Sequence, residues 1–340
     1  MIFLLTQAIG KPAGKAKLAQ IFHIFAFQIH HLIATIYRST GSWYDMKDET
    51  GQPWKGRIKG VFKIDDITST NPLAVGDVVE FEVEDKDKFI GTINGIADRH
   101  NYISRQSPGH RKQHHIVASN LDQVLLVATF KDPRTSPGFT DRFLVAAEAY
   151  HVPAIILVNK MDTWRLKEQQ KFTEWEDRYG KIGYRILSCS VTTGENLHRL
   201  KEMLTDKTTL ISGHSGVGKS SLLNALVPDW KLKIGDVSGW SGKGMHTTTF
   251  AEMFDLPFGG KVIDTPGIRE FGIVQIEKPE LSHYFPEMRE LIDGCQFNNC
   301  LHINEPECAV KDAVMDGRIA GERYFSYINI LDSLPDNDWA

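Results

Sequence analysis

Cysteine is scarce in this sequence, and long apolar runs are missing from it. Only four cysteines occur in 340 residues, and three of them fall between 295 and 308. That clustering favours a metal site in a reducing compartment and argues against a disulfide framework. No uncharged apolar stretch reaches the roughly 20 residues that a membrane-spanning helix needs. The sequence therefore excludes a disulfide-stapled scaffold, and we expect no membrane partner.

An excess of positive charge is also missing. The net charge of -4 excludes a uniformly basic nucleic-acid binder, so any RNA contact has to come from a local patch. One segment fits, because no acidic residue occurs between Asp98 and Asp122. It combines one aromatic ring, Tyr102, with eight basic side chains: Arg99, His100, Arg105, His110, Arg111, Lys112, His114 and His115. Such residues can neutralise phosphates and stack on a base, although a linker can also be basic merely to remain solvated.

The length of the chain predicts two or three domains, because a single hydrophobic core stops growing at about 250–300 residues. Residues 1–32 are an extension of uncertain status. Three lysines precede the apolar run 21–27, as in a signal peptide, but the run and its flank contain three histidines and no small-residue cleavage site follows. We expect a cytoplasmic protein whose extension is either poorly ordered or read from a start codon assigned too early.

Residues 33–106 are expected to form a small β-barrel. Alternating segments that predict strands occur at 32–38, 54–63, 78–83 and 89–93, with glycines between them. An OB-fold, a five-stranded barrel that often binds oligonucleotides, is the leading interpretation. The alternative is a β-domain without a ligand.

An α/β pattern with a phosphate-binding loop follows the basic segment. The apolar runs 123–130 and 154–158 predict buried parallel strands, and a helix is expected from about Thr140. Residues 210–212 predict a short strand, and Ser221 opens a helix. Between them lies a GxxxxGK[ST] motif, whose backbone N–H groups cradle phosphates at a helix N-terminus. The candidate phosphate-binding residues are Gly213, His214, Ser215, Gly216, Val217, Gly218, Lys219, Ser220 and Ser221.

A base-reading element, NKxD, ends the strand 154–158. The Asp162 carboxylate can accept hydrogen bonds from guanine N1–H and from the exocyclic amine, a donor pair that adenine lacks. The Lys160 stem can pack over the base, and Asn159 can tie the loop to its neighbours. The remaining candidates for this GTP-binding loop and for a second base-contacting loop are Met161, Ser188 and Cys189, with Cys189 a small loop residue that has no metal or nucleophilic role.

The order of these motifs is inverted. NKxD precedes the phosphate-binding loop, which in turn precedes a DxxG switch at Asp264–Gly267. In an ordinary GTPase the base-reading element comes last. Residues 107–275 are therefore expected to form a circularly permuted P-loop GTPase domain. Permutation lets the switch run through residues 269–271 directly into the next domain, and we hypothesise that switch movement repositions that domain.

Hydrolysis and Mg²⁺ binding involve the segment between the two phosphate-facing motifs. Ser220 and either Thr248 or Thr247 are expected to ligate Mg²⁺, Asp264 acts on it through water, and the Gly267 N–H faces the γ-phosphate. The position after Gly267, where GTPases often carry a glutamine, is Ile268, which cannot orient water. His246 is the candidate catalytic residue, because an imidazole can orient or deprotonate water. The alternative is a histidine that only holds the switch loop.

Residues 276–340 are expected to form a mostly helical zinc-binding domain. Three thiolates and one imidazole can close a tetrahedral shell, and a closed shell is structural. The ligands lie within fourteen positions: Cys295, Cys300, His302 and Cys308. Helices are expected at 309–319 and 324–331, around a core too small to be stable without the metal.

Together these motifs resemble the bacterial small-ribosomal-subunit biogenesis GTPase A family. The resemblance covers the chain from about residue 33 and includes the segments 39–44, 74–77 and 264–270, while Met245 departs from the arginine or glutamine that commonly precedes the histidine. It implies a monomeric GTPase that binds GTP and GDP, is stimulated by the 30S subunit, acts late in that subunit's maturation, and places its barrel and zinc domains on 16S rRNA. The alternatives are a regulatory GTPase of a pathway independent of ribosomes and a non-catalytic RNA-binding adaptor.

Overall fold

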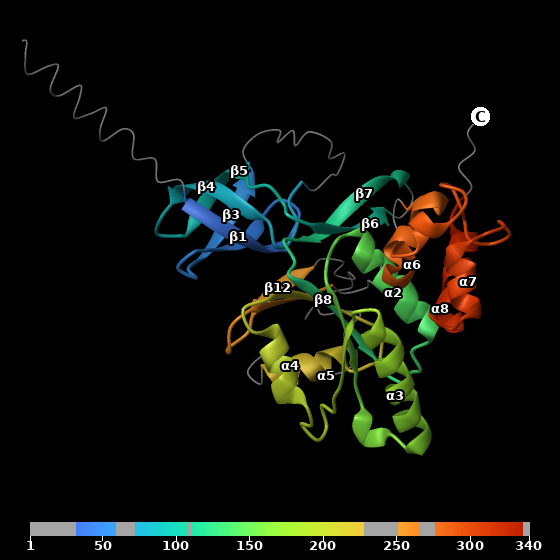
Figure 1. The fold of residues 1–340 in the computed structure, drawn as a ribbon. Coiled ribbons are helices and arrows are strands. Elements are labelled where there is room, and N and C mark those ends of the chain that lie inside the picture. The colour runs from blue at the N-terminus through green and yellow to red at the C-terminus, as the bar shows by residue number, and fades with distance from the viewer. Residues whose placement is uncertain (1–31, 59–71, 108–109, 228–250, 266–275, 336–340) are drawn as a thin grey trace, which may run out of the picture.

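The computed structural model describes residues 32–58, 72–107, 110–227, 251–265 and 276–335, with side chains omitted for 105–115. A β-barrel, a central α/β domain and a helical C-terminal part are distinct in Figure 1. Residues 1–31 and the predicted residues His246, Thr247, Thr248 and Gly267 lie outside the described residues. None of the helices in the described ranges is long and apolar enough to cross a bilayer.

The N-terminal part is a closed five-stranded barrel, as predicted. Its strands pair in the order β1-β2-β3-β5-β4, and β4 pairs back onto β1. Apolar side chains from alternate positions fill it, among them Ile36, Met46 and Phe81. The strands are β1 (Leu32–Ser39), β2 (Tyr44–Asp48), β3 (Pro53–Ile58), β4 (Val78–Asp85) and β5 (Ile90–Ile96).

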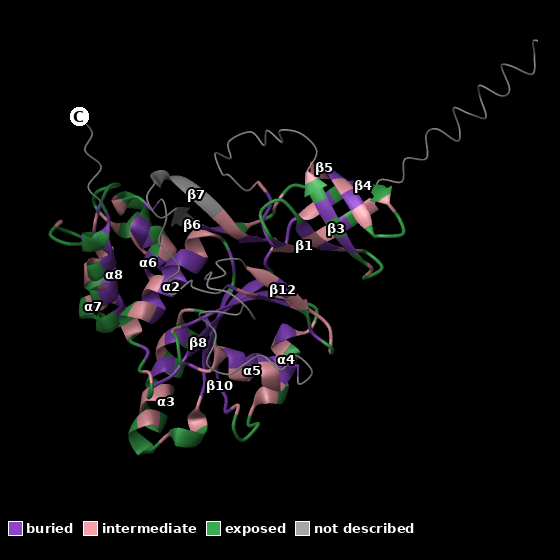
Figure 2. Ribbon diagram, turned by 180° about the vertical axis from the view of Figure 1, so that it is seen from behind, coloured by how far each residue is buried: buried purple, intermediate pink, exposed green. Residues whose placement is uncertain are grey.

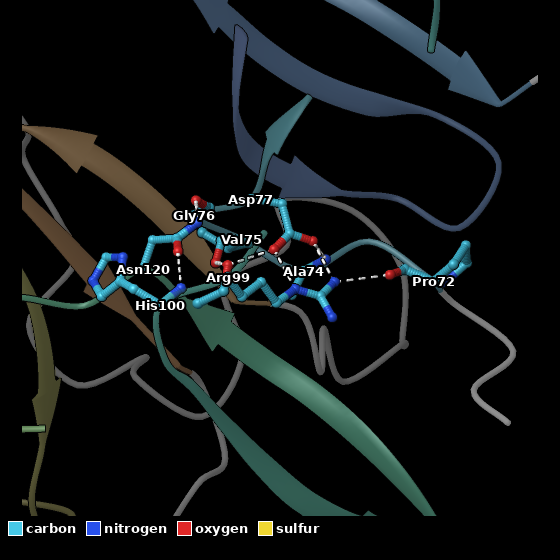
Figure 3. A network of polar contacts seen from close by, with 9 residues as sticks. Pro72, Ala74, Val75, Gly76, Asp77, Arg99, His100 and Asn120 are labelled. Carbon is cyan, nitrogen blue, oxygen red and sulfur yellow. Dashed lines mark hydrogen bonds and ion pairs between the residues drawn. The ribbon is translucent and has the colours of Figure 1, made fainter. Parts of the chain in front are cut away.

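The basic segment after the barrel forms a β-hairpin of β6 (Tyr102–Ser107) and β7 (His110–Ser119). Arg99, which we predicted to face RNA, is instead part of the junction between barrel and hairpin (Figure 3). Its Nε and Nη2 donate to the two carboxylate oxygens of Asp77, each at 2.6 Å. The Asp77 side chain is fully buried and also accepts from the Ser119 hydroxyl at 2.6 Å and the Ala74 N–H at 2.7 Å. Arg99 is therefore a structural residue.

The central domain is an α/β sheet covered on both faces. Its strand order is β10-β9-β8-β11-β13-β12, parallel except for β12. Strands β8 and β9 are buried along their whole length (Figure 2). Their side chains alternate between an apolar cluster shared with α2 and α3 and another shared with α4 and α5. The elements are β8 (Gln123–Ala128), α2 (Pro137–Ala149), β9 (Ala154–Val158), η2 (Met161–Thr163), α3 (Leu166–Lys181), β10 (Arg185–Ser188), α4 (Leu197–Leu204), β11 (Thr208–Ser212), α5 (Lys219–Leu226), β12 (Glu252–Asp255) and β13 (Lys261–Asp264).

The C-terminal part is a small helical domain that packs on α2. It contains η4 (Lys278–Tyr284), α6 (Pro286–Arg289), η5 (Ile292–Gly294), α7 (Ala309–Met315) and α8 (Gly321–Ser333). Val145 of α2 belongs to the same apolar cluster as Phe285 and Tyr327. The buried Arg323 lies against this cluster, 4.5 Å from the centroid of the Phe285 ring. It donates to Asp141 of α2 at 2.8 Å and to Glu287 at 2.6 Å. The two domains are thus joined by apolar packing and by buried charge.

Candidate nucleotide and metal sites

The phosphate-binding loop connects β11 to α5 at the carboxyl edge of the sheet. Two of its glycines have positive φ and face close neighbours, so a side chain would not fit. A Cβ on Gly213 would lie 2.3 Å from the Val127 carbonyl oxygen, and one on Gly218 would lie 2.5 Å from Asn159 Nδ2. Ser215 and Gly216 are exposed at the tip of the loop, whereas Val217 and Ser220 are buried beneath it. The loop therefore presents backbone to the open edge and anchors itself with side chains.

Lys219 is the first residue of α5 and Asp264 is the last residue of β13, and the two side chains interact electrostatically at this edge of the sheet. The Lys219 ammonium donates to the carbonyls of Gly213 at 2.6 Å and His214 at 2.8 Å. Burial lowers the pKa of Lys219 and raises the pKa of Asp264, and the charge of each partner opposes that shift in the other. A hydroxyl from Ser220 and a carboxylate from Asp264 are hard oxygen donors, which suit Mg²⁺.

Asn159 joins the base-reading element to the phosphate-binding loop. Its side chain is buried, and its Nδ2 donates to the Val217 carbonyl at 2.9 Å. Its Oδ1 faces the second base-contacting loop, where it lies 3.5 Å from Cys189 Sγ. Burial, followed by the nearby Asp162 charge, raises the pKa of Cys189 to about 12, which keeps it a neutral thiol. The three loops that we predicted to meet around a nucleotide are therefore brought together by one amide.

Lys160 and Asp162 are held in place by neighbouring loops. The Lys160 ammonium donates to the carbonyls of Asp132 and of Gly216, the latter at 2.8 Å. Asp162 is exposed, and its Oδ1 accepts the hydroxyl hydrogen of Ser190 at 2.6 Å. Met161 and Ser188 contribute backbone: the Met161 N–H donates to Cys189, and the Ser188 carbonyl accepts from Asn196. The Asp162 carboxylate is thus presented to the outside in a fixed orientation.

Three contacts in this site were not predicted from the sequence, although Ser190, which makes one of them, lies in the second base-contacting loop. Ser190 orients Asp162, Asp132 receives Lys160 through its backbone, and Phe139 of α2 packs on His214 of the phosphate-binding loop with ring centroids 3.6 Å apart. A hydroxyl two residues beyond Ser188 is a signal that could have been used for Ser190. The other two contacts carry no signal in the sequence, because they depend on a carbonyl and on packing.

The four predicted metal ligands form one cluster in the C-terminal domain. Their ligand atoms all lie within 4.8 Å of one another. A tetrahedral zinc shell with metal–sulfur bonds of about 2.3 Å places sulfurs about 3.8 Å apart, and Cys295 Sγ lies 3.9 Å from Cys308 Sγ. His302 Nδ1 faces these sulfurs at 3.6 and 3.3 Å. The residues therefore fit a four-coordinate ion and could hold one.

The surroundings of this cluster also suit a metal ion. Burial lowers the pKa of His302, which leaves the imidazole neutral and able to bind a cation, and burial raises the pKa of Cys300 to about 12. Buried thiolates need a nearby positive charge, which a metal ion supplies. His302 Nε2 is buried without a hydrogen-bond partner among the described residues. The Tyr324 hydroxyl fixes this segment by donating to the His302 carbonyl at 2.6 Å.

Comparisons with known proteins agree with this architecture. The family model described as RsgA GTPase matches residues 96–274, and the model of the RsgA N-terminal domain matches residues 34–93. A protein of Christiangramia forsetii named small ribosomal subunit biogenesis GTPase RsgA is 47% identical over 89% of this chain and 96% of its own length. One of the same name from Flavobacterium psychrophilum is 50% identical over 87% of this chain and 91% of its own length.

Two solved structures have the same fold. YjeQ from Thermotoga maritima superposes with a TM-score of 0.73 at 35% identity, over 89% of this chain and 98% of that one. YloQ, titled a circularly permuted GTPase, superposes with a TM-score of 0.70 at 31% identity, over 91% and 98% of the two chains. The inverted motif order therefore has a structural counterpart in solved proteins.

Proposed function

This chain belongs to the family of RsgA GTPases, and from this premise we propose that it hydrolyses GTP as a late step in the maturation of the small ribosomal subunit. That it is a GTP hydrolase follows from the family itself. The observation that carries the proposal is the Asn159 amide, which joins a guanine-reading loop to a phosphate-binding loop in a chain that also carries a closed barrel.

Within this proposal each part of the site has one task. Asp162 selects guanine, and residues 213–221 surround the phosphates. The base pocket is shaped by Asn159, Lys160, Met161, Ser188 and Cys189. Mg²⁺ is held by Ser220, by either Thr247 or Thr248, and by Asp264 through water. The Gly267 N–H faces the γ-phosphate. Mg²⁺, when bound, neutralises charge on the phosphate oxygens. His246 orients or deprotonates the attacking water.

The metal of the C-terminal cluster is assigned as one structural zinc ion. Three thiolates and an imidazole are the soft donor set that zinc prefers, and four protein ligands leave no open position for catalysis. We keep the division into an extension at 1–32, an OB-fold domain at 33–106, a GTPase domain at 107–275 and a zinc-binding domain at 276–340. We propose that the barrel and the zinc domain bind 16S rRNA, and that the protein is a monomer in the cytoplasm.

Addition of 30S subunits is expected to raise the rate of GTP turnover. We expect at least about a tenfold increase, which corresponds to about 1.4 kcal/mol of extra transition-state stabilisation. The assay compares single-turnover rates with and without 30S subunits, with 50S subunits as the control, and cosedimentation with a GTP analogue against GDP measures which state is retained. A rate indifferent to 30S subunits would instead favour a regulatory GTPase of another pathway.

Replacement of Asp162 with asparagine is expected to change the base preference. The change removes the charge that accepts from guanine, and a hydrogen bond to a charged group contributes about 1.5–3 kcal/mol. GTP affinity should therefore fall about ten- to hundredfold, while xanthosine triphosphate, which carries an acceptor at the 2-position, should bind better than GTP. Fluorescent nucleotide titrations measure both.

The matched control is Asp177→Asn on α3. Asp177 is also exposed and, among the described residues, forms its ion pair with Lys181 of its own helix, so affinities should be unchanged. Undiminished GTP preference in the Asp162 variant would mean that another group reads the base.

A further inference from the structure

Strand β12 lies between the two segments that are expected to respond to the γ-phosphate. It begins three residues after Thr249, and its antiparallel partner β13 ends at Asp264. In the register of this pair, Glu252 is the direct partner of Asp264 and Asp255 is the direct partner of Lys261. Any shift of β12 along or away from β13 is therefore felt at Asp264.

The barrel is attached to the free edge of this strand. Strand β1 pairs with β12 at Arg38 and Glu252, so the 11-stranded sheet continues from the GTPase domain into the barrel. Arg38, Glu252 and Asp264 consequently occupy one rung across three neighbouring strands. With about 4.8 Å between strands, the barrel backbone lies only about 10 Å from that of Asp264.

Side chains fasten this contact at both ends of β12. The Tyr37 hydroxyl donates to Asp255 Oδ1 at 2.5 Å, and the Lys47 ammonium donates to the other oxygen of the same carboxylate. Lys47 also lies 4.6 Å from the centroid of the Tyr37 ring. At the other end, Arg38 Nη1 lies 4.0 Å from Glu252 Oε1. We call these five residues the seam: Tyr37, Arg38 and Lys47 of the barrel with Glu252 and Asp255 of β12.

We propose that, when the barrel is bound to RNA, the seam makes the barrel a positioning element for GTP hydrolysis. Tyr37 and Lys47 hold Asp255, Arg38 lies beside Glu252, and through β12 these residues then set the position of Asp264. The inference rests on the proposed function, because the barrel must bind RNA before the seam can pass a movement of the barrel on to β12. In the free protein β12 is already held by β13 and by the buried Met253, so basal turnover does not depend on the seam. It acts when the barrel is engaged.

The second attachment of the barrel, its junction with the hairpin, is much less exposed to water than the seam. At the junction of Figure 3 the ion pair of Arg99 and Asp77 is nearly dry, with side-chain exposures of 10% and 0%. At the seam the Lys47 and Asp255 side chains are 34% and 45% exposed, and ion pairs exposed to water contribute little to stability. An open cleft of about 640 Å³ adjoins the seam, lined by Tyr37, Lys47, Asp255 and Lys261 among others. The charge pair of the junction is therefore the firmer of the two, and within the proposal the Lys47–Asp255 pair of the seam is the contact that can tighten or loosen.

The test compares the double variant Tyr37→Phe, Asp255→Asn with the wild type in the full-length protein. Both changes keep the shape of the side chain and remove the hydrogen bond and the charge. We expect basal turnover to remain within about twofold, because β12 keeps its pairing with β13, and 30S-stimulated turnover to fall about fivefold, the lower range for coupling between sites. Glu252→Gln, which weakens the other end of the seam, is expected to act in the same direction.

A structural readout separates positioning from simple loss of stability. Spin labels attached without cysteine chemistry at the exposed Lys86 of the barrel and Thr173 of α3 report the distance between the two domains. The wild-type distance should differ between GDP and a GTP analogue, and the double variant should lose this difference. The control is Glu84→Gln, which breaks an ion pair of similar exposure between Arg57 and Glu84 inside the barrel.

Each outcome decides the matter. The proposal is overturned if the double variant and Glu84→Gln have the same 30S-stimulated turnover and the same distances between the spin labels. A wild type that is not stimulated by 30S subunits overturns the proposed function alone, and the seam is then judged on the distance measurement: a nucleotide-dependent distance that persists in the double variant rejects it, and one that is lost supports it.

Discussion

Replacement of Cys308 with serine is expected to release the metal and to unfold part of the C-terminal domain. Cys308 Sγ lies within 3.9 Å of two other ligands of the cluster. It also accepts a hydrogen bond from the Lys311 N–H at 3.5 Å and so caps the first turn of α7. The change therefore removes a metal ligand and weakens the start of a helix at the same time.

The expected effect is large because the metal contributes much of the stability of so small a core. Structural zinc in isolated zinc-finger peptides contributes about 10–16 kcal/mol of apparent binding free energy at neutral pH. This domain has its own apolar cluster, so part of the fold should persist. We nevertheless expect hydrogen-exchange protection of α7 to be lost and that of α8 to fall. The zinc content, near one per chain in the wild type, should drop below detection.

Cys189 supplies the matched control, since it is the one cysteine of the sequence outside the cluster. Cys189→Ser removes a buried thiol next to the base-contacting loop and should leave the zinc content at one. Both variants are purified under reducing conditions, and their zinc content is measured by inductively coupled plasma mass spectrometry. Freshly reduced wild-type protein without zinc, or a Cys308 variant that retains it, contradicts the assignment.

The buried strands and the motifs were predictable from the sequence because their signal is local. The apolar run 154–158 is buried at every position, and Gly213 and Gly218 of the phosphate-binding loop stand where a neighbouring residue comes close to the backbone. β2 was missed, because Tyr44–Asp48 is short and mostly polar, and only Tyr44 and Met46 of its residues are buried. Its place in the barrel is decided by β1 and β3 on either side.

Long-range charge pairing was the part that the sequence could not provide. Arg99 was assigned to an RNA-facing segment, yet its partner Asp77 lies 22 residues earlier, just before β4. Charged residues are almost never fully buried unless they are paired, so a sequence gives no reason to place one inside. The same holds for Arg323, whose side chain is only 1% exposed. Pairs of this kind become visible only when the domains are seen in contact.

Replacement of Arg323 with methionine is expected to destabilise the contact between the GTPase and C-terminal domains by about 3–5 kcal/mol, the range for breaking a buried ion pair by removal of one partner. Burial lowers the pKa of Arg323, and the Asp141 and Glu287 carboxylates more than restore it, so the guanidinium stays charged. Without it, both carboxylates would remain buried and unpaired. Asp141 is the critical one, because its Oδ2 already lacks a partner among the described residues.

A second variant distinguishes lost charge balance from lost packing. In the combination of Arg323→Met with Asp141→Asn and Glu287→Gln all three charges are gone. The amide oxygen introduced at position 141 can still accept from the Tyr179 hydroxyl, which donates to Asp141 at 2.9 Å in the wild type. Removal of a whole buried ion network costs much less than removal of one member. We therefore expect most of the lost stability to return, as measured by the denaturant midpoint and by hydrogen exchange of α8.

The rim of the same interface offers the control. Arg178 of α3 pairs with Glu322 of α8 at 2.6 Å, and the two side chains are 12% and 62% exposed. Since Glu322 stays in water when its partner is removed, Arg178→Met should cost no more than about 1 kcal/mol. A loss in the Arg323 variant no larger than this would mean that water reaches the buried carboxylates.

The consequence for the nucleotide follows from α2, which carries Asp141 near its start and packs Phe139 against His214. Since both contacts lie in its first turns, release of α8 should loosen the phosphate-binding loop, and GTP should dissociate faster from the Arg323 variant than from the Arg178 control.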